Sequence, residues 1–128
     1  MTKYVLDSYA WVEYFIASEK GRKVKEILEA RNNEIHTSVI TIAEVCGKAK
    51  KENADVEEAY RQMLLISKIE SITPEIAKEA SSLRHEMRKK EENFGLADAI
   101  ILVTAKTIGA KVLTGDRHFK GIKEAQML

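Results

Sequence analysis

The chain has 128 residues, enough for one domain with its own core and too few for two domains of typical size. Hydrophobic residues make up 45% of the chain and charged residues 32%, a balance that is typical of a globular protein and excludes a disordered chain. The 21 basic and 20 acidic side chains give a formal net charge of +1, which lacks the strongly basic signature of a non-specific nucleic-acid binder. Any contact with nucleic acid therefore requires a local patch or a bound cation.

The sequence also bears on the cellular compartment. No basic segment followed by a long apolar stretch opens the chain, so a signal peptide is not expected. The longest wholly apolar run, Ala99–Val103, is too short to span a bilayer. The one cysteine, Cys46, excludes an internal disulfide and fits a reducing compartment. We therefore expect a cytoplasmic protein with a single domain over residues 1–128.

Short apolar runs predict strands, and helical segments lie between them. In chain order, the strand candidates are residues 4–6, 35–38, 69–72, 111–114 and 125–128. Ser18 precedes the first clearly amphipathic helix, and Asp55 with Glu58 forms a capping-box-like start for another. Thr73 and Pro74 have the residue types expected at the N-cap and first position of a third helix.

One further segment, residues 96–108, is apolar nearly all round and predicts a buried helix that ends at Gly109. Strands that alternate with helices favour a parallel sheet covered on both faces. We therefore predict an α/β fold: a three-layer α/β/α sandwich with a mostly parallel sheet of about five strands.

Four acidic residues fall where such a sheet forms its binding sites, outside the carboxyl ends of the strands. Asp7 directly follows the first predicted strand, and Asp116 follows the fourth. Glu44 lies in the first turns of the helix after the second strand, and Asp98 lies at the start of the buried helix. All four are therefore expected at one edge of the sheet, with Glu44 and Asp98 on helix faces that pack inward.

Carboxylates directed at one point repel one another, so at least one would keep its proton unless a cation lay between them. Oxygen ligands without His or Cys favour Mg²⁺ or Mn²⁺ over zinc, and Mg²⁺ keeps positions for water and phosphate oxygens. Taken singly, each acid is better explained as a helix cap or a solvated charge. Taken together, they indicate a divalent-metal site open to a phosphate-bearing substrate.

Four short segments carry a resemblance to a known family. They are Leu6-Asp7-Ser8, Ile42-Ala43-Glu44-Val45, Leu96-Ala97-Asp98-Ala99 and Leu113-Thr114-Gly115-Asp116-Arg117-His118-Phe119. In order and spacing they resemble the signature segments of the PIN-domain ribonucleases, and most closely those of the VapC-type toxins of type II toxin–antitoxin pairs. The resemblance implies a five-stranded parallel sheet, endoribonuclease activity that depends on Mg²⁺ or Mn²⁺, a homodimer, and inhibition by a small antitoxin protein.

Carried over by position, Asp7, Glu44 and Asp98 become the main metal ligands and Asp116 the fourth acid. Two hydroxyl residues, Ser8 and Thr114, match positions that often support the site. Taken by itself, Ser8 is better explained as the N-cap of the next helix, and Thr114 is also explained as a partner of a local backbone group. The expected reaction is hydrolysis of an RNA phosphodiester bond.

Other polar residues receive weaker predictions. Arg117 is the best candidate for a phosphate contact, because it follows Asp116 directly. His36 is expected to be a structural residue in a strand, and His85 to lie on a polar helix face. His118 is expected near the acids, but at the surface rather than in catalysis.

Three alternatives compete with a nuclease. A haloacid-dehalogenase-like phosphatase needs a second acid two residues after Asp7, where this chain has Tyr9. A response-regulator receiver needs an aspartate after the third strand, where this chain has Ile72-Thr73-Pro74. A catalytically silent PIN-like module for RNA binding or assembly would not need the acids, all four of which are present.

Overall fold

The computed structural model describes all residues, 1–128, as five strands and six α-helices with one short 3₁₀ helix. The strands are β1 (Thr2–Leu6), β2 (Asn33–Ser38), β3 (Lys68–Glu70), β4 (Lys111–Thr114) and β5 (Ala125–Met127). The helices are α1 (Ser8–Phe15), α2 (Glu19–Glu29), α3 (Val39–Lys51), α4 (Val56–Ile66), α5 (Pro74–Met87), α6 (Leu96–Ile108) and the 3₁₀ helix η1 (Arg117–Phe119).

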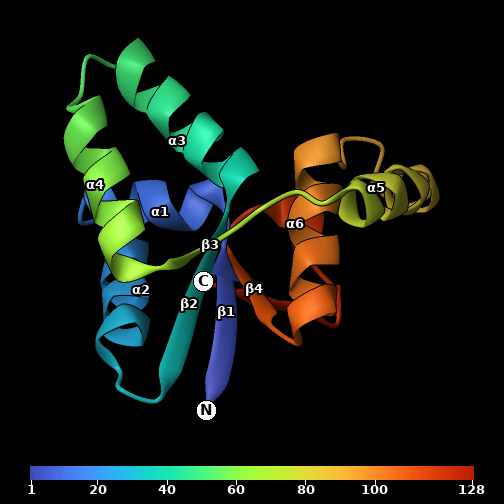
Figure 1. The fold of residues 1–128 in the computed structure, drawn as a ribbon, viewed down its shortest axis with the longest axis horizontal. Coiled ribbons are helices and arrows are strands. Elements are labelled where there is room, and N and C mark those ends of the chain that lie inside the picture. Colours follow the sequence, from blue (N-terminus) through green and yellow to red (C-terminus); the bar gives the residue numbers. More distant parts are fainter.

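All five strands are parallel and pair in the order β3-β2-β1-β4-β5 (Figure 1). The chain therefore starts in the middle of the sheet, builds outward to β3, and returns through α5 and α6 to complete the other half. The predicted parallel sheet of about five strands is confirmed.

The sheet separates two hydrophobic clusters, which makes the fold the predicted three-layer sandwich. Neighbouring residues of β1 belong to opposite clusters: Tyr4 and Leu6 pack with α1 and α2, whereas Val5 packs with α5 and α6. The alternation follows from the period of two in a strand. In the α5–α6 layer, Phe94 and Phe119 are fully buried and meet edge to face, with ring centroids 5.6 Å apart. This contact anchors η1 to the segment that precedes α6.

Several helix ends form as the sequence predicts. The side chains of Ser18, Asp55 and Thr73 each accept a backbone N–H of the first turn that follows. Gly109 ends α6 in the left-handed conformation, with φ of 69°, which glycine adopts without strain.

The third strand differs from its prediction. The sequence predicts residues 69–72, but β3 pairs only over Lys68–Glu70. Ile72 has left the sheet and packs against the α5–α6 cluster, while Thr73 already caps α5. The apolar residue that marked the predicted end of the strand thus packs in the layer above the sheet.

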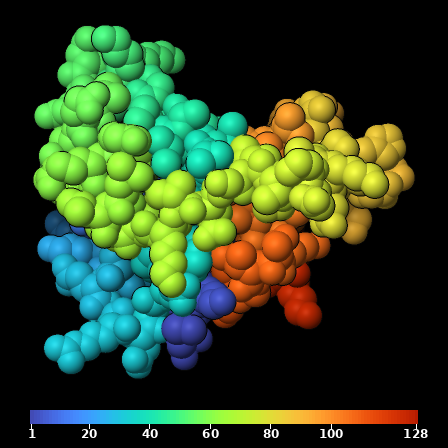
Figure 2. All heavy atoms as spheres, viewed as in Figure 1, coloured from blue at the N-terminus to red at the C-terminus, as the bar shows by residue number.

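None of the helices is both long and apolar enough to cross a membrane. In the space-filling view, the green surface of α4 and the yellow surface of α5 lie on opposite sides of the molecule (Figure 2).

Candidate active site at the carboxyl edge of the sheet

The four acidic residues come from elements that converge at the carboxyl ends of β1, β2 and β4. Asp7 links β1 to α1, and Asp116 links β4 to η1. Glu44 belongs to the second turn of α3, and Asp98 to the first turn of α6. Parallel strands in neighbouring positions place these four starting points at the same edge.

Asp7 is the most deeply buried member, with an exposed fraction of 4%. It caps α1: its Oδ1 accepts the backbone N–H of Ala10 at 2.9 Å, and its Oδ2 accepts the hydroxyl of Thr114. The pKa of Asp7 is raised to about 7: burial is the largest cause, the hydrogen bonds from Thr114 and Ala10 oppose it, and the carboxylates of Asp116 and Asp98 add to it. Asp7 therefore becomes ionised only at a cost in free energy, unless a cation is close by.

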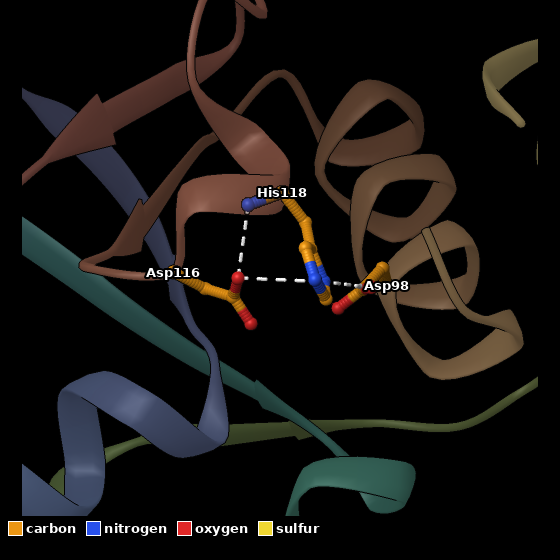
Figure 3. Close-up of side chains that lie close together, drawn as sticks. All are labelled: Asp98, Asp116 and His118. Atoms are coloured by element: carbon orange, nitrogen blue, oxygen red, sulfur yellow. Dashed lines mark hydrogen bonds and ion pairs between the residues drawn. The ribbon is translucent and has the colours of Figure 1, made fainter. Parts of the chain in front are cut away.

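Asp98 and Asp116 meet around His118 (Figure 3). The Nδ1 atom of His118 lies 3.1 Å from Oδ2 of Asp98 and 3.4 Å from Oδ1 of Asp116. Each carboxylate also accepts a backbone N–H at 2.9 Å, from Gly95 for Asp98 and from His118 itself for Asp116. One ligand atom from each of the three residues lies within 4.8 Å of the other two, as in a metal site.

Glu44 stands farther out than the sequence predicts. The expectation that it packs inward is wrong, because Glu44 is an exposed residue on α3. Its carboxyl group nevertheless borders the site: it lines a hollow of about 430 Å³ together with Ser8, Tyr9 and Asp116. Desolvation raises the pKa of Glu44, the Ser8 hydroxyl lowers it, and the charges of Asp98 and Asp116 raise it further.

The two hydroxyl residues have different surroundings. Thr114 is fully buried, donates to Asp7 and accepts the backbone N–H of Asp116 at 2.9 Å, so it joins the two acids. Ser8 is not the helix cap that the sequence favours, because Asp7 fills that position. Ser8 instead lies beside Glu44.

Gly115, between Thr114 and Asp116, is the point of closest approach to α1. A Cβ atom at this position would lie 2.2 Å from the ring of Tyr9. The Tyr9 ring therefore packs directly against the turn that carries Asp116, and its hydroxyl accepts a hydrogen bond from the Lys20 ammonium at 3.0 Å.

The remaining predictions concern one arginine and the histidines. Arg117 is exposed on η1, next to Asp116, and forms no ion pair with an acid of the site. His36 is buried in β2 in a separate cluster, and His85 is exposed on α5. His118 is the residue that the sequence analysis missed: it was expected at the surface, yet it is half-buried and bridges two of the acids. Its position in a turn capped by Asp116, two residues away, is the signal that would have found it.

The fold and this cluster define a class: an α/β sandwich with an acidic site where its parallel strands end. The PIN domain family model matches residues 4–125. No curated protein sequence matches the chain. The chain belongs to the PIN domain family, and the resemblance to its VapC-type toxins is confirmed.

Solved structures agree with this assignment. A toxin–antitoxin complex from Klebsiella pneumoniae contains a chain that is 30% identical, with a TM-score of 0.77 and a match that covers 96% of this chain and 95% of that one. VapC20 of Mycobacterium tuberculosis, described as a toxin that cleaves the sarcin–ricin loop, is 14% identical with a TM-score of 0.78, over 95% and 96% of the two chains. VapBC2 of Rickettsia felis, bound to a promoter DNA fragment, is 20% identical with a TM-score of 0.74, over 99% and 98%. The last two likenesses concern the fold alone.

Proposed function

We propose that this protein is a metal-dependent endoribonuclease that hydrolyses RNA phosphodiester bonds and acts as the toxin of a toxin–antitoxin pair. Membership of the PIN domain family and the likeness to VapC-type toxins support a nuclease. The observation that carries the proposal is the convergence of Asp98, Asp116 and His118 within 4.8 Å, next to the buried Asp7.

The donor set fits a divalent cation. Oδ1 of Asp98 and Oδ2 of Asp116 have no hydrogen-bond partner in the protein. No lysine or arginine forms an ion pair with any of the four acids. Carboxylate oxygens without a cationic partner are the ligands that Mg²⁺ and Mn²⁺ prefer. Asp7, Glu44, Asp98 and Asp116 would hold the ion.

When bound, such an ion lowers the pKa of water and stabilises negative charge on the phosphoryl group. The neighbouring residues of the chain orient the carboxylates that would hold the ion. The Thr114 hydroxyl links the Asp7 carboxylate to the backbone of Asp116, which fixes the two residues relative to one another. His118 holds Asp98 and Asp116 at a fixed separation through its ring and backbone nitrogens. His118 is thus a positioning residue in this proposal.

Asp98→Asn tests the reaction. Asparagine keeps an oxygen to accept the Gly95 N–H, so the start of α6 should be preserved. We expect cleavage of a single-stranded RNA in Mg²⁺ or Mn²⁺ to fall at least about 100-fold, the size of effect found when one stabilising group of an active site is removed. Chelation of the metal should abolish cleavage by the unchanged protein.

Asp55→Asn is the control, because the Asp55 carboxylate also accepts a backbone N–H at a helix start, from Glu58 at 3.0 Å, but Asp55 is the N-cap of α4 and lies outside the site. This variant should cleave RNA at the original rate. Equal cleavage by Asp98→Asn and Asp55→Asn would contradict the proposed site. RNA binding without metal-dependent cleavage by the unchanged protein would favour the silent PIN-like module, and release of phosphate from monoesters would favour a phosphatase.

A small antitoxin protein is the proposed regulator, because several similar solved structures are toxin–antitoxin complexes. Large apolar side chains exposed on α4 and after α1 support a protein partner: Ile16, Tyr60, Leu64 and Leu65. The homodimer and a cytoplasmic location remain parts of this proposal, and sedimentation of the purified chain would test the dimer.

A further inference from the structure

Two hollows flank the acidic site, and their charges are opposite. The hollow beside α1 is lined by Glu13, Glu44 and Asp116, with Lys48 as its one cationic residue. A second hollow, of about 520 Å³, lies between the C-terminal end of α5 and η1. We call it the basic hollow, and its polar lining consists of Lys90, Glu91, Arg117, His118 and Lys120. The basic hollow thus has three permanent cations against one acid.

These three cations are available to a ligand. Lys89, their neighbour on the chain, pairs with Glu86 at 3.2 Å. Lys90, Arg117 and Lys120 are exposed and form no ion pair with any carboxylate. In a chain with nearly equal numbers of basic and acidic residues, three unpaired cations around one hollow form a local positive patch.

The backbone beneath the patch is fixed. Phe119, between the two cations of the η1 segment and fully buried, packs edge to face on Phe94. The Arg88 guanidinium donates to the carbonyl of Phe94 at 2.9 Å, which ties the end of α5 to the same anchor. Asp116 accepts the backbone N–H of His118 and so caps η1. The cations therefore extend from a preorganised frame, which reduces the ordering cost of binding.

His118 connects this patch to the acids. Its Nδ1 atom lies 3.1 Å from Asp98 and 3.4 Å from Asp116, as Figure 3 shows, and the same residue lines the basic hollow. A strand whose phosphodiester bond lies at the acids would therefore have its next phosphates within reach of the cations on this side. On the α1 side, the same phosphates would meet Glu13, with Lys48 as the one cation of that hollow.

We propose that the basic hollow binds the phosphate backbone of the RNA strand immediately beyond the cleaved bond, with Lys90, Arg117 and Lys120 as the phosphate contacts. The proposal rests on the proposed ribonuclease function and adds the path of the substrate: the strand crosses η1, not α1. Contacts to phosphates carry no base information, so this subsite is sequence-independent.

The test is binding, measured apart from catalysis. A fluorescently labelled 12-nucleotide single-stranded RNA is titrated with protein in EDTA, and anisotropy gives the affinity at a series of KCl concentrations. The Arg117→Gln/Lys120→Gln variant should bind at least about fivefold more weakly at low salt. Its slope of log K against log salt should be smaller by about 1.4, because two phosphate contacts are lost at about 0.7 each.

Two further variants test whether the effect depends on the position and on the charge of the substituted residues. Lys23→Gln/Lys25→Gln removes two cations from α2, on the opposite face of the sheet, and should leave affinity and slope unchanged. Arg117→Lys/Lys120→Arg keeps both charges and should restore binding. An unchanged slope for the first variant, equal losses for the α2 variant, or no binding by the unchanged protein would overturn the proposal. Displacement by polyglutamate of equal charge as readily as by RNA would overturn it in favour of an acidic protein partner.

Failure of this subsite and failure of the proposed function give different results. If the unchanged protein cleaves RNA in Mg²⁺ while Arg117→Gln/Lys120→Gln binds RNA as before, the ribonuclease stands and the path of the strand is wrong. If binding depends on the basic hollow but no metal restores cleavage, the subsite stands and the ribonuclease is wrong.

Discussion

Two polar clusters of this molecule each combine carboxylates with one histidine, but they differ in the balance of their charges. At β2 and β3, Nδ1 of His36 lies 2.9 Å from Glu70 and Nε2 lies 2.9 Å from Glu34, which Lys68 also binds at 2.9 Å. Two carboxylates there share two basic partners. At the carboxyl edge of the sheet, one histidine contacts two of the four carboxylates, and no lysine or arginine forms an ion pair with any of them. In the first cluster the carboxylates have basic partners from the protein itself, whereas in the second cluster negative charge is in excess.

The pKa shifts follow this difference. The hydrogen bond from Lys68 lowers the pKa of Glu34. At the carboxyl edge, burial raises the pKa of Asp7 to about 7 and desolvation raises that of Glu44. The buried Asp7 carboxylate has no lysine or arginine partner, and a bound cation would offset the free-energy cost of its charge. The comparison supports a structural role for the His36 cluster and agrees with the proposed cation site in the acidic cluster.

The largest expected effect on stability comes from Asp7→Asn in the metal-free protein. Because the folded pKa of about 7 exceeds the unfolded value of 3.8, folded Asp7 keeps its proton between these values and unfolded Asp7 does not. Stability from this group is present below pH 3.8 and is lost as pH rises toward 7. Between pH 4 and 8, Asp7→Asn should therefore gain about 4 kcal/mol in unfolding free energy relative to the unchanged protein, at 1.36 kcal/mol per pKa unit.

Urea unfolding in EDTA at several pH values measures this difference. Asparagine at position 7 keeps an acceptor for the Ala10 N–H, so the cap of α1 should survive. Asp55→Asn makes the same change at an exposed cap and should follow the unchanged protein at every pH. If the unfolding free energies of Asp7→Asn and the unchanged protein varied with pH in parallel, the pKa of Asp7 would not be raised by folding, which would contradict this prediction.

A smaller effect is expected in the His36 cluster. His36→Gln removes a buried ring and leaves Glu70 without its partner, which should cost about 1–3 kcal/mol in unfolding free energy. RNA cleavage should be unchanged below the melting temperature. His85→Gln, at an exposed position of α5, should alter neither stability nor cleavage. If His36→Gln were folded but no longer cleaved RNA, the His36 cluster would not have a purely structural role, and the comparison would be wrong.

The smallest effect is expected outside both clusters. Lys25 and Glu29 form an ion pair of 3.8 Å on α2, with side chains that are 62% and 67% exposed. Lys25→Gln should change the unfolding free energy by less than about 0.5 kcal/mol, because water and salt screen such pairs. Thermal melts give this baseline. If Lys25→Gln lost as much unfolding free energy as His36→Gln, the buried His36 cluster would contribute no more to stability than an exposed ion pair, which would contradict the comparison.

The sequence could predict the sheet and the edge at which the four acids lie, because Asp7 and Asp116 directly follow strands and Asp98 and Glu44 lie in the first two turns of helices. It could not predict the exposure of Glu44, which depends on how α3 leans over the sheet, or the turn that brings His118 back to Asp98. Ile72 shows the same limit: its apolar side chain is equally suited to a strand or to packing under α5. Periodicity locates elements along the chain, while contacts between distant elements decide which side chains meet.

Binding of Mn²⁺ to the purified, EDTA-stripped protein at pH 7.5, followed by isothermal titration calorimetry, tests the central claim most directly. The unchanged protein and Asp55→Asn should bind the ion with equal affinity. Asp98→Asn/Asp116→Asn should bind it at least about tenfold more weakly, a loss on the scale found when groups of a metal site are removed. No binding by the unchanged protein, or equal binding by all three, would contradict a cation site built from these acids.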